Sequence, residues 1–480
     1  MPLLSPRIGF NYDITADGSL RLRGGTGIFT GRFPLIFLSK MQEGSGMLQT
    51  SLQIKDAKDP LLQYFAGKGV LTPSQVLNEL VPSLPADQQK RFPTQPGAVT
   101  NLIAIDRNFK MPQVWKSTLA IDWRLPLPFD NLFTLEGTFA KDINAITAYD
   151  ANIDPSKVEA RRFNGNDNRY FYPGMKNVRI HPDNGYAYVM TNTSKGYSAN
   201  IMAQLTMTPV RNLDLMAAYT FTTSKALNPM GSNQIENTPN NLATVNGYNY
   251  AEVGNARYIF SPHRVIASAS YRLSYARNKM QTLVSLFYEG RKNGSYSYVY
   301  STDMNNDGIN QDLIYIPSSK DELLFQDIKD KQGNVTFSAA EQSEAFWAFV
   351  NQDPYLSSHK GQYAEQYAAY NPWLNRFDLR LSQEFKVKVG NSVNRLQLNL
   401  DILNLGNLLN SGWGLAKSAR TAAGKPLNRV GVDANNTPIF NMSTYNDRDG
   451  KLRLVDSTYD VLRGSTYCWQ MQIGVKYIFN

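Results

Sequence analysis

The sequence predicts an all-β protein: an antiparallel transmembrane β-barrel of about eleven strands with long loops on one side of the membrane. Three observations predict this class: strands that are apolar on one side, connections that alternate between short and long, and a low mean hydropathy of −0.38. A barrel crosses the bilayer with an apolar outer face and a polar interior, so its mean hydropathy can be negative. No run approaches the roughly 18 to 20 apolar residues that a spanning helix needs.

The last segment, 469–480, has the clearest alternation. One face carries Trp469, Met471, Ile473, Val475, Tyr477 and Phe479, and the other carries Cys468, Gln470, Gln472, Gly474 and Lys476. Large apolar side chains on one strand face need a cover, and lipid supplies it without a second sheet.

The same period of two predicts ten further strands. With the last one, the strands are at 6–14, 19–31, 112–125, 131–147, 196–207, 212–224, 261–274, 279–290, 374–388, 394–406 and 465–479.

The connections between these strands strictly alternate in length. Short ones are at Thr15–Gly18, Pro126–Asp130, Thr208–Arg211, Tyr275–Asn278 and Val389–Val393; long ones are near 32–111, 148–195, 225–260, 291–373 and 407–464. Outer-membrane barrels use tight turns in the periplasm and long loops outside the cell. With that orientation the first and last strands both run inward, whereas a complete bacterial barrel has an even number of strands and both termini in the periplasm. The chain is therefore predicted to be part of a larger barrel, with 6–14 and 465–479 as unpaired sheet edges or forced together in a smaller, strained cylinder.

Aromatic residues lie near the proposed periplasmic ends of the strands, where an interfacial belt would place them. They are Phe10, Tyr12, Trp123, Phe129, Phe133, Tyr271, Tyr275, Tyr477 and Phe479. The alternative is that these aromatics fill a soluble β-core.

Several segments together resemble the barrel of Oar-like TonB-dependent outer-membrane receptors of the Bacteroidetes type. In order, they read SPRIGFNYDI, LRLRGGTGIFTGRFP, FKMPQVWKSTLAIDWRLP, GYSANIMAQLT, LDLMAAYTFTTSKAL, FSPHRVIASASYRL, NRFDLRLSQEF and LNLDILNLGNLLNSGWG. The resemblance implies a Gram-negative outer-membrane location and a 22-stranded barrel, of which residues 1–480 would form the C-terminal half. It also implies ligand transport, with TonB engaged through a plug, and barrel-insertion machinery and outer-membrane lipid as further partners.

The chain departs from the family pattern in several places. Signal peptide, TonB box, plug and the first half of the barrel are missing, so the natural N-terminus is expected upstream of Met1. The terminal aromatic is penultimate, as Phe479. Transport by this chain alone is therefore in question, and a surface binding or adhesion protein without transport is the alternative function.

Composition excludes some classes of protein. Cys468 is the only cysteine, which rules out disulfides within the chain and Cys-based metal sites. The net charge of +9 is spread along polar strand faces and loops without a basic block, so nucleic acid is not an expected partner.

One loop has the spacing of a calcium site. Asp303, Asn305 and Asp307 stand at positions one, three and five, Gly308 follows at six, and Asp312 is at ten. This pattern resembles the start of an EF-hand loop, but Ile314 occupies the twelfth position in place of the bidentate Glu. The sequence leaves two readings open: calcium bound by Asp303, Asn305, Asp307 and Asp312, or a solvated turn rich in Asp and Asn.

No catalytic motif is evident, and we expect no enzyme activity and no cofactor. His181, His263 and His359 are the only histidines, without HExxH or G-x-S-x-G. Gly24, Gly25, Gly27 and Gly31 read G-x-G-x-x-x-G within a strand, which favours sharp curvature or a close approach of another backbone over a dinucleotide site. An outer-membrane lipase or protease would need a small even-stranded barrel with clustered Ser, His and Asp.

Charged residues alternate along the polar strand faces, which predicts ion pairs that stiffen the barrel wall rather than a substrate site. They are Asp122, Glu136, Asp378, Glu384 and Asp401 with Arg124, Arg376, Arg380 and Arg395. The loops 32–111 and 291–373 are long enough to be functional. The second of these loops contains tyrosines that could bind sugars or peptides: Tyr296, Tyr298, Tyr300, Tyr363, Tyr367 and Tyr370.

Overall fold

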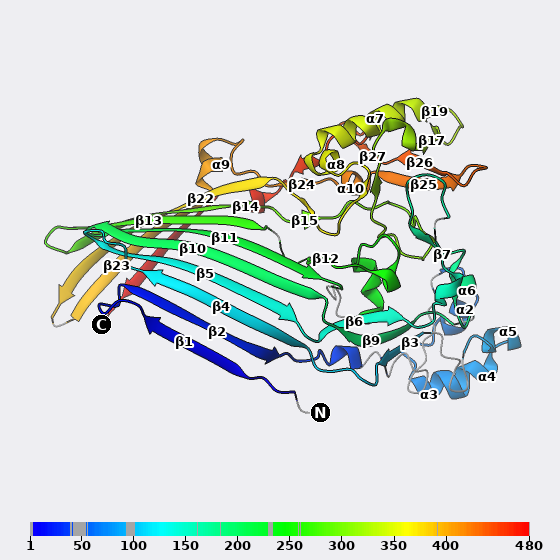
Figure 1. Ribbon diagram of the computed structural model, residues 1–480, viewed down its shortest axis with the longest axis horizontal. Coiled ribbons are helices and arrows are strands. Elements are labelled where there is room, and N and C mark those ends of the chain that lie inside the picture. Colours follow the sequence, from blue (N-terminus) through cyan, green and yellow to red (C-terminus); the bar gives the residue numbers. More distant parts are fainter. Residues whose placement is uncertain are drawn as a thin grey trace.

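A computed structural model describes residues 3–38, 41, 54, 56–92, 101–160, 162–182, 184–228, 234–257, 259, 261–390 and 392–479. Eleven long strands form one antiparallel sheet in which each strand pairs with the next in sequence (Figure 1). They are β1 Arg7–Asp13, β2 Leu20–Thr30, β4 Gln113–Trp123, β5 Asp130–Asp142, β10 Gly196–Val210, β11 Leu213–Ala226, β13 His263–Tyr275, β14 Met280–Lys292, β22 Trp373–Val389, β23 Ser392–Leu403 and β30 Gln470–Ile478. A short strand, β12 (Gly254–Asn255), extends the sheet beside β11.

All eleven predicted strands are present, with some of their ends displaced from the prediction. The strand at 131–147 ends at Asp142, and Ala145–Asp150 (β6) pairs with β9 (Ala187–Thr193) in a separate sheet. The strand at 394–406 ends at Leu403, because Asn404 adopts a left-handed conformation (φ 57°) and a short helix, α9 (Leu405–Leu409), follows. The segment at 465–479 begins with a 3-10 turn, Ser465–Tyr467, before β30.

Within the described residues, β1 and β30 are the two edges of the sheet. The prediction of unpaired edges is confirmed, and the alternative of a strained cylinder was wrong. That the eleven strands are half of a 22-stranded barrel stays a prediction.

The two faces of the sheet differ in polarity. Residues paired across antiparallel strands point to the same side of the sheet. One such row contains Tyr12, Leu22, Ile121, Leu135, Ala203 and Tyr219, and the next row contains Asp13, Arg21, Asp122, Thr134 and Gln204. The apolar face is open to its surroundings: Ile473 is 75% exposed and Ile8 is 71% exposed. No second layer of the described chain buries these side chains, which is what a lipid-facing surface requires.

The short turns gather at one end of the strands and the long loops at the other (Figure 1). Asn212 and Gly18 supply positive φ angles in two of these turns, and residue 391 of a third turn lies outside the described residues. β1 starts at the loop end and β30 finishes at the turn end, so both run in the predicted direction (Figure 1).

Aromatics mark both ends of the apolar face. Near the turns, Tyr12, Trp123, Tyr271 and Tyr477 are exposed, as predicted. A second group, which was not predicted, lies near the loops, where Phe139 lies between Trp115 and Tyr197 with ring centroids 6.2 and 6.3 Å away. Trp115 and Trp123 are eight residues apart on β4, or about 27 Å at ~3.4 Å per residue. At a strand tilt of about 40°, this spacing covers about 21 Å of the roughly 25 Å height of the apolar band of a barrel.

The glycines of β2 bring neighbouring strands close together. A Cβ on Gly24 would lie 2.9 Å from the Phe10 ring and 2.9 Å from the Thr118 carbonyl oxygen, and one on Gly27 would lie 2.8 Å from the Pro6 carbonyl oxygen. The predicted close backbone approach therefore involves the adjacent strands of the same sheet.

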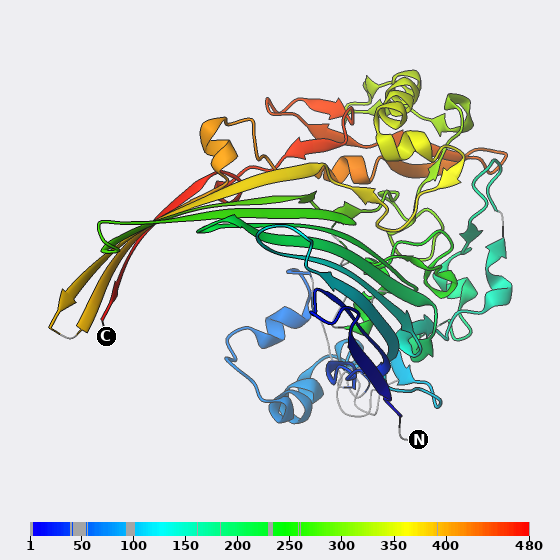
Figure 2. The same ribbon diagram turned by 60° about the vertical axis from the view of Figure 1, so that its left-hand side comes forward.

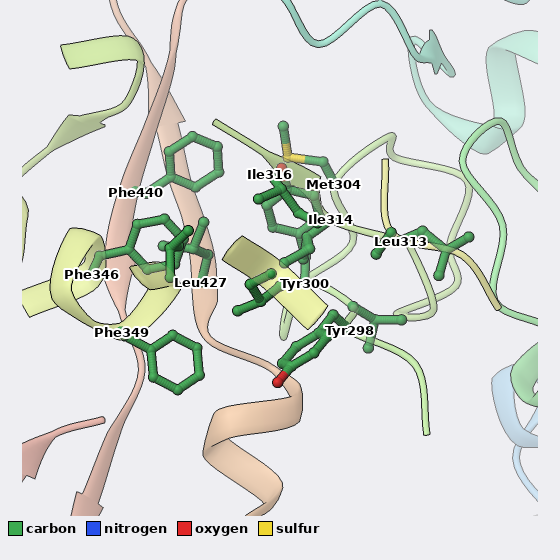
Figure 3. Packing of buried hydrophobic residues seen from close by; sticks show 14 of the residues in the cluster. Tyr298, Tyr300, Met304, Leu313, Ile314, Ile316, Phe346, Phe349, Leu427 and Phe440 are labelled. Atoms are coloured by element: carbon green, nitrogen blue, oxygen red, sulfur yellow. The ribbon is translucent and has the colours of Figure 1, made fainter. Parts of the chain in front are cut away.

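The long loops contain most of the buried core. Clustered side chains from four of them include Phe171, Ala243, Tyr298, Tyr300, Ile314, Phe346, Phe349, Leu427 and Phe440 (Figure 3). We call this set and its supporting segments the loop domain; Figure 2 shows it beside the outer end of the sheet. A smaller cluster around Leu61 and Val81 joins the short helices α2 (Leu61–Phe65) and α4 (Val81–Ser83) of the first loop.

The loop domain is built from short strands and helices. Its strands are β15 Ser295–Tyr296 with β21 Ala369–Tyr370, β16 Tyr315–Ile316 with β20 Gln362–Tyr363, β17 Leu324–Phe325 with β26 Pro438–Met442 and β25 Leu427–Val432, β24 Lys417–Ala419 with β29 Tyr459–Val461, and β27 Thr444–Asn446 with β28 Leu452–Leu454. Its helices are α7 Ala339–Gln352, α8 Pro354–Ser358 and α10 Thr421–Gly424. Elsewhere the loops form β3 Leu102–Ile105, β7 Glu159–Ala160, β8 Tyr170–Phe171, β18 Ile328–Lys329, β19 Val335–Phe337, α2 Leu61–Phe65, α3 Pro73–Gln75, α4 Val81–Ser83, α5 Ala86–Gln89 and α6 Met175–Val178.

Helix α7 begins with a capping box. The Ser338 hydroxyl accepts a hydrogen bond from the Glu341 backbone N–H, and the Ser338 N–H donates to the Glu341 carboxylate. Its buried positions, Gln342, Phe346, Phe349 and Val350, fall on one helix face and enter the loop core. None of the described helices is both long and apolar enough to cross a bilayer.

Candidate ligand-binding site in the folded loops

A polar cavity of about 720 Å³ lies among three of the long loops. Its lining includes Asn240, Asn241, Ser295, Ser297, Gln311 and Thr421, the rings of Tyr296 and Tyr367, and the cations Arg257, Arg420 and Lys425. The residues come from 240–257, 295–311, 367 and 419–425, so only the folded loops assemble the site. No carboxylate lines the cavity.

Hydrogen bonds within and between the loops hold the cavity walls. The Tyr367 N–H donates to the Ser297 hydroxyl (2.8 Å), and the Tyr367 hydroxyl donates to the Asn241 carbonyl (3.2 Å). The Arg420 N–H donates to the Thr458 carbonyl (2.9 Å). Tyr367 has a positive φ of 48°, a strained conformation for a non-glycine residue that the surrounding contacts maintain.

The six tyrosines singled out above in loop 291–373 have different environments. Tyr298 and Tyr300 are fully buried in the loop core, so neither can contact a ligand. The Tyr298 hydroxyl donates to the buried carboxylate of Asp353 (2.7 Å), which also accepts from Thr458 (2.7 Å). Tyr296 and Tyr367 line the cavity, whereas Tyr363 and Tyr370 are not among its lining residues.

The predicted calcium loop is a buried turn rather than a solvated one. The Asp303 carboxylate accepts from the N–H groups of Asn306 (2.6 Å) and Gly308 (2.7 Å), and Asp312 accepts from Met304 (2.7 Å). Gly308 has a φ of +86°, which only glycine adopts without strain. Ile314, at the twelfth position, is fully buried and cannot contribute a ligand.

Burial raises the pKa values of the three carboxylates. The pKa of Asp307 lies well above its usual range because the group is desolvated and faces the charges of Asp312 and Asp303. Burial raises the pKa of Asp312 to about 7, although Arg169 opposes the shift. In the part of the chain that the structure describes, no group of three or more His, Cys, Asp or Glu side chains is arranged to hold a metal ion.

Calcium binding by Asp303, Asn305, Asp307 and Asp312 stays a prediction. We expect millimolar calcium to raise the melting temperature of the loop domain relative to EGTA, because the cation relieves repulsion among the carboxylates. At 100 times its Kd a ligand stabilises by about 2.7 kcal/mol. Differential scanning calorimetry measures the shift, with Asp307→Asn as the variant that should lose it. An equal melting temperature in calcium and EGTA would contradict calcium binding.

The predicted ion pairs of the polar face form with partly different partners. Arg376–Asp378 (3.0 Å) and Arg380–Asp401 (2.5 Å) are as expected. Asp122 and Glu136 share Arg23, at 2.9 and 3.0 Å, and Glu384 pairs with Lys386 (3.4 Å). Among the described residues Arg124 and Arg395 form no ion pair, so their predicted participation was wrong. The strand register explains why Arg23 reaches Asp122 and Glu136, because it places Arg23 on the polar face beside β4.

The three histidines are far apart along the fold. His263 lies on the apolar face with its Nδ1 2.6 Å from the Tyr219 hydroxyl, and the His359 ring stacks on Tyr355. His181 is exposed in a loop. Within the described ranges none forms an ion pair or hydrogen bond with a carboxylate.

A larger cavity of about 1010 Å³ has a different character. Leu205, Ala217, Ala267, Leu286 and Phe377 line it on the apolar face of the sheet, below Trp413. Lipid chains cover such a face in a membrane, so the polar loop cavity is the better candidate for capturing a soluble ligand.

Comparison with known proteins identifies the family. The sequence matches the family described as "Outer membrane beta barrel domain" over residues 3–427. No curated protein matches. The structure is similar to that of the outer membrane transporter YddB from Escherichia coli, with 10% sequence identity and a TM-score of 0.38. The match covers 99% of this chain and 40% of the transporter chain, so the protein spans less than half of that chain's length. The family match covers most of the sequence, and the protein therefore belongs to the outer membrane beta barrel domain family and is located in the outer membrane.

Proposed function

We propose that the protein is part of a TonB-dependent outer-membrane receptor of the Oar-like type, forming barrel wall and ligand-capturing loops without catalysis. The observation that carries the proposal is the polar loop cavity at the outer end of a lipid-facing sheet. Four long loops share one buried core, which gives the cavity fixed walls. Preformed concave sites with a few convergent polar groups are typical of ligand binding.

The experiment measures depletion of a defined mixture of organic acids, sugars and short peptides from the medium of the native bacterium. Three cultures are compared: intact cells, cells lacking the gene, and intact cells treated with a protonophore. We expect one or more components to be depleted only by intact, energised cells. Equal depletion of every component by all three cultures would refute the transport proposal.

Adhesion is the alternative outcome. In that case cells would lose attachment to a polymer or host surface when the gene is deleted, and a protonophore would not affect attachment.

A further inference from the structure

The polar loop cavity has a strong excess of positive charge. Arg257, Arg420 and Lys425 line it, whereas no Asp or Glu does. A cleft lined by charges of one sign focuses the electric field and raises the local concentration of oppositely charged molecules.

Arg420 lacks the partners that a shielded guanidinium needs. Its Nε and Nη1 atoms are shielded from solvent and have no hydrogen-bond partner. The nearest carboxylate oxygen, Asp456 Oδ1, is 3.9 Å from Nη1, and the Asp456 side chain is 69% exposed. The guanidinium lies over the Tyr445 ring at 4.4 Å, a contact that uses none of its N–H donors. The Arg420 side chain as a whole is 23% exposed, so a ligand in the cavity can reach its open part but not the shielded Nε and Nη1 atoms.

The other two cations are also available to a ligand. Arg257 makes only a long hydrogen bond of 3.4 Å to the Asn241 side-chain oxygen. Lys425 forms no ion pair among the described residues. Its backbone is fixed, because its N–H donates to the Thr421 carbonyl (3.2 Å) and its carbonyl accepts from the Ser443 hydroxyl (2.5 Å).

We infer that this cavity binds a small anion, a molecule bearing carboxylate or phosphate, through Arg420 with Lys425 and Arg257. The guanidinium fork suits both groups, since it can donate two parallel hydrogen bonds. A volume of about 720 Å³ suits a small molecule rather than a polymer. The inference rests on the proposed function and specifies its ligand class.

The test is isothermal titration calorimetry on the purified full chain in detergent micelles. The probes are glucuronate, citrate and inorganic phosphate, with glucose as the neutral probe. We expect one or more anions to bind, with an affinity that falls as salt is raised. Glucuronate or citrate alone would assign carboxylate recognition, and inorganic phosphate alone would assign phosphate recognition.

Variants separate a binding role from a structural one. Arg420→Gln and Lys425→Gln should each weaken anion binding by about tenfold or more, since a charge-assisted hydrogen bond contributes about 1.5–3 kcal/mol. Lys331→Gln, at the exposed tip of the β18–β19 hairpin, is the matched control and should bind normally. Lys425→Gln provides the test if Arg420→Gln does not fold. Unchanged affinity in the Lys425 and Arg420 variants, glucose binding as tight as that of the anions, or no binding by any anion would overturn the inference. Anion binding without energised uptake would instead refute the transport proposal alone.

Discussion

Replacing Arg169 with Met is expected to destabilise the loop domain by about 3–5 kcal/mol, the cost of removing one partner from a buried ion pair. Arg169 is fully buried, with its Nε 2.9 and 3.0 Å from the two Asp167 oxygens. Its Nη2 donates to the Leu313 carbonyl (2.8 Å), and its Nη1 lies 3.8 Å from Asp312. Without the guanidinium, the carboxylates of Asp167 and Asp312 lose the cation that pairs with them in the core.

The measurement is hydrogen exchange by mass spectrometry over 298–316, the segment that contacts Arg169. Exchange there should accelerate in Arg169→Met, whereas the strands of the main sheet should stay protected. Arg162→Met is the matched control, because the Arg162 ion pair with Glu159 is on the surface and such pairs contribute about 0–1 kcal/mol.

A second substitution checks the physical cause. Adding Asp167→Asn to Arg169→Met removes one of the uncompensated charges, so part of the protection should return. If the double variant exchanges as fast as the single one, lost packing rather than buried charge explains the effect.

Replacing Ile201 with Arg on the apolar face is expected to cost about 2–4 kcal/mol in a bilayer, the range for Arg at the midplane of a barrel. Ile201 is 50% exposed, and it pairs with Gly137 and Phe221 in the middle of the sheet. In lipid its side chain meets acyl chains, which cannot solvate a guanidinium.

The matched control introduces the same residue one position earlier. Asn200 points to the polar face, where its side chain donates to the Thr222 hydroxyl (2.7 Å), so Asn200→Arg should lose about 0.5–1.5 kcal/mol for that hydrogen bond. Urea unfolding from phosphatidylcholine vesicles measures both variants. Equal costs at 200 and 201 would refute the assignment of the apolar face to lipid.

The eleven strands of the main sheet could be predicted because the signal is local. A strand that contacts lipid on one side and polar groups on the other alternates at every residue, as 469–479 does. The errors occurred at strand ends, where Asn404 turns the chain with a left-handed conformation and Asp142 ends one sheet before β6 starts another. No periodic signal marks such points.

The loop domain was not predicted, although one part of it could have been. Helix α7 could have been predicted from the sequence, because Ser338 and Glu341 form a capping box, and Phe346, Phe349 and Val350 recur at helical spacing. The rest could not, because the core combines residues that are distant in sequence, such as Phe171, Tyr300 and Phe440. The candidate site has the same origin, since Arg257, Tyr367 and Arg420 become neighbours only when three loops pack together.

The sequence by itself determined the strands, their order and their polarity, because each depends on neighbours a few residues away along the chain. Tertiary structure alone decided which arginine pairs with Asp122 and Glu136, that Arg169 is enclosed, and that Arg420 lines a cavity. The physical reason is that burial and electrostatic pairing depend on distance in space, which loop packing sets and local periodicity does not encode.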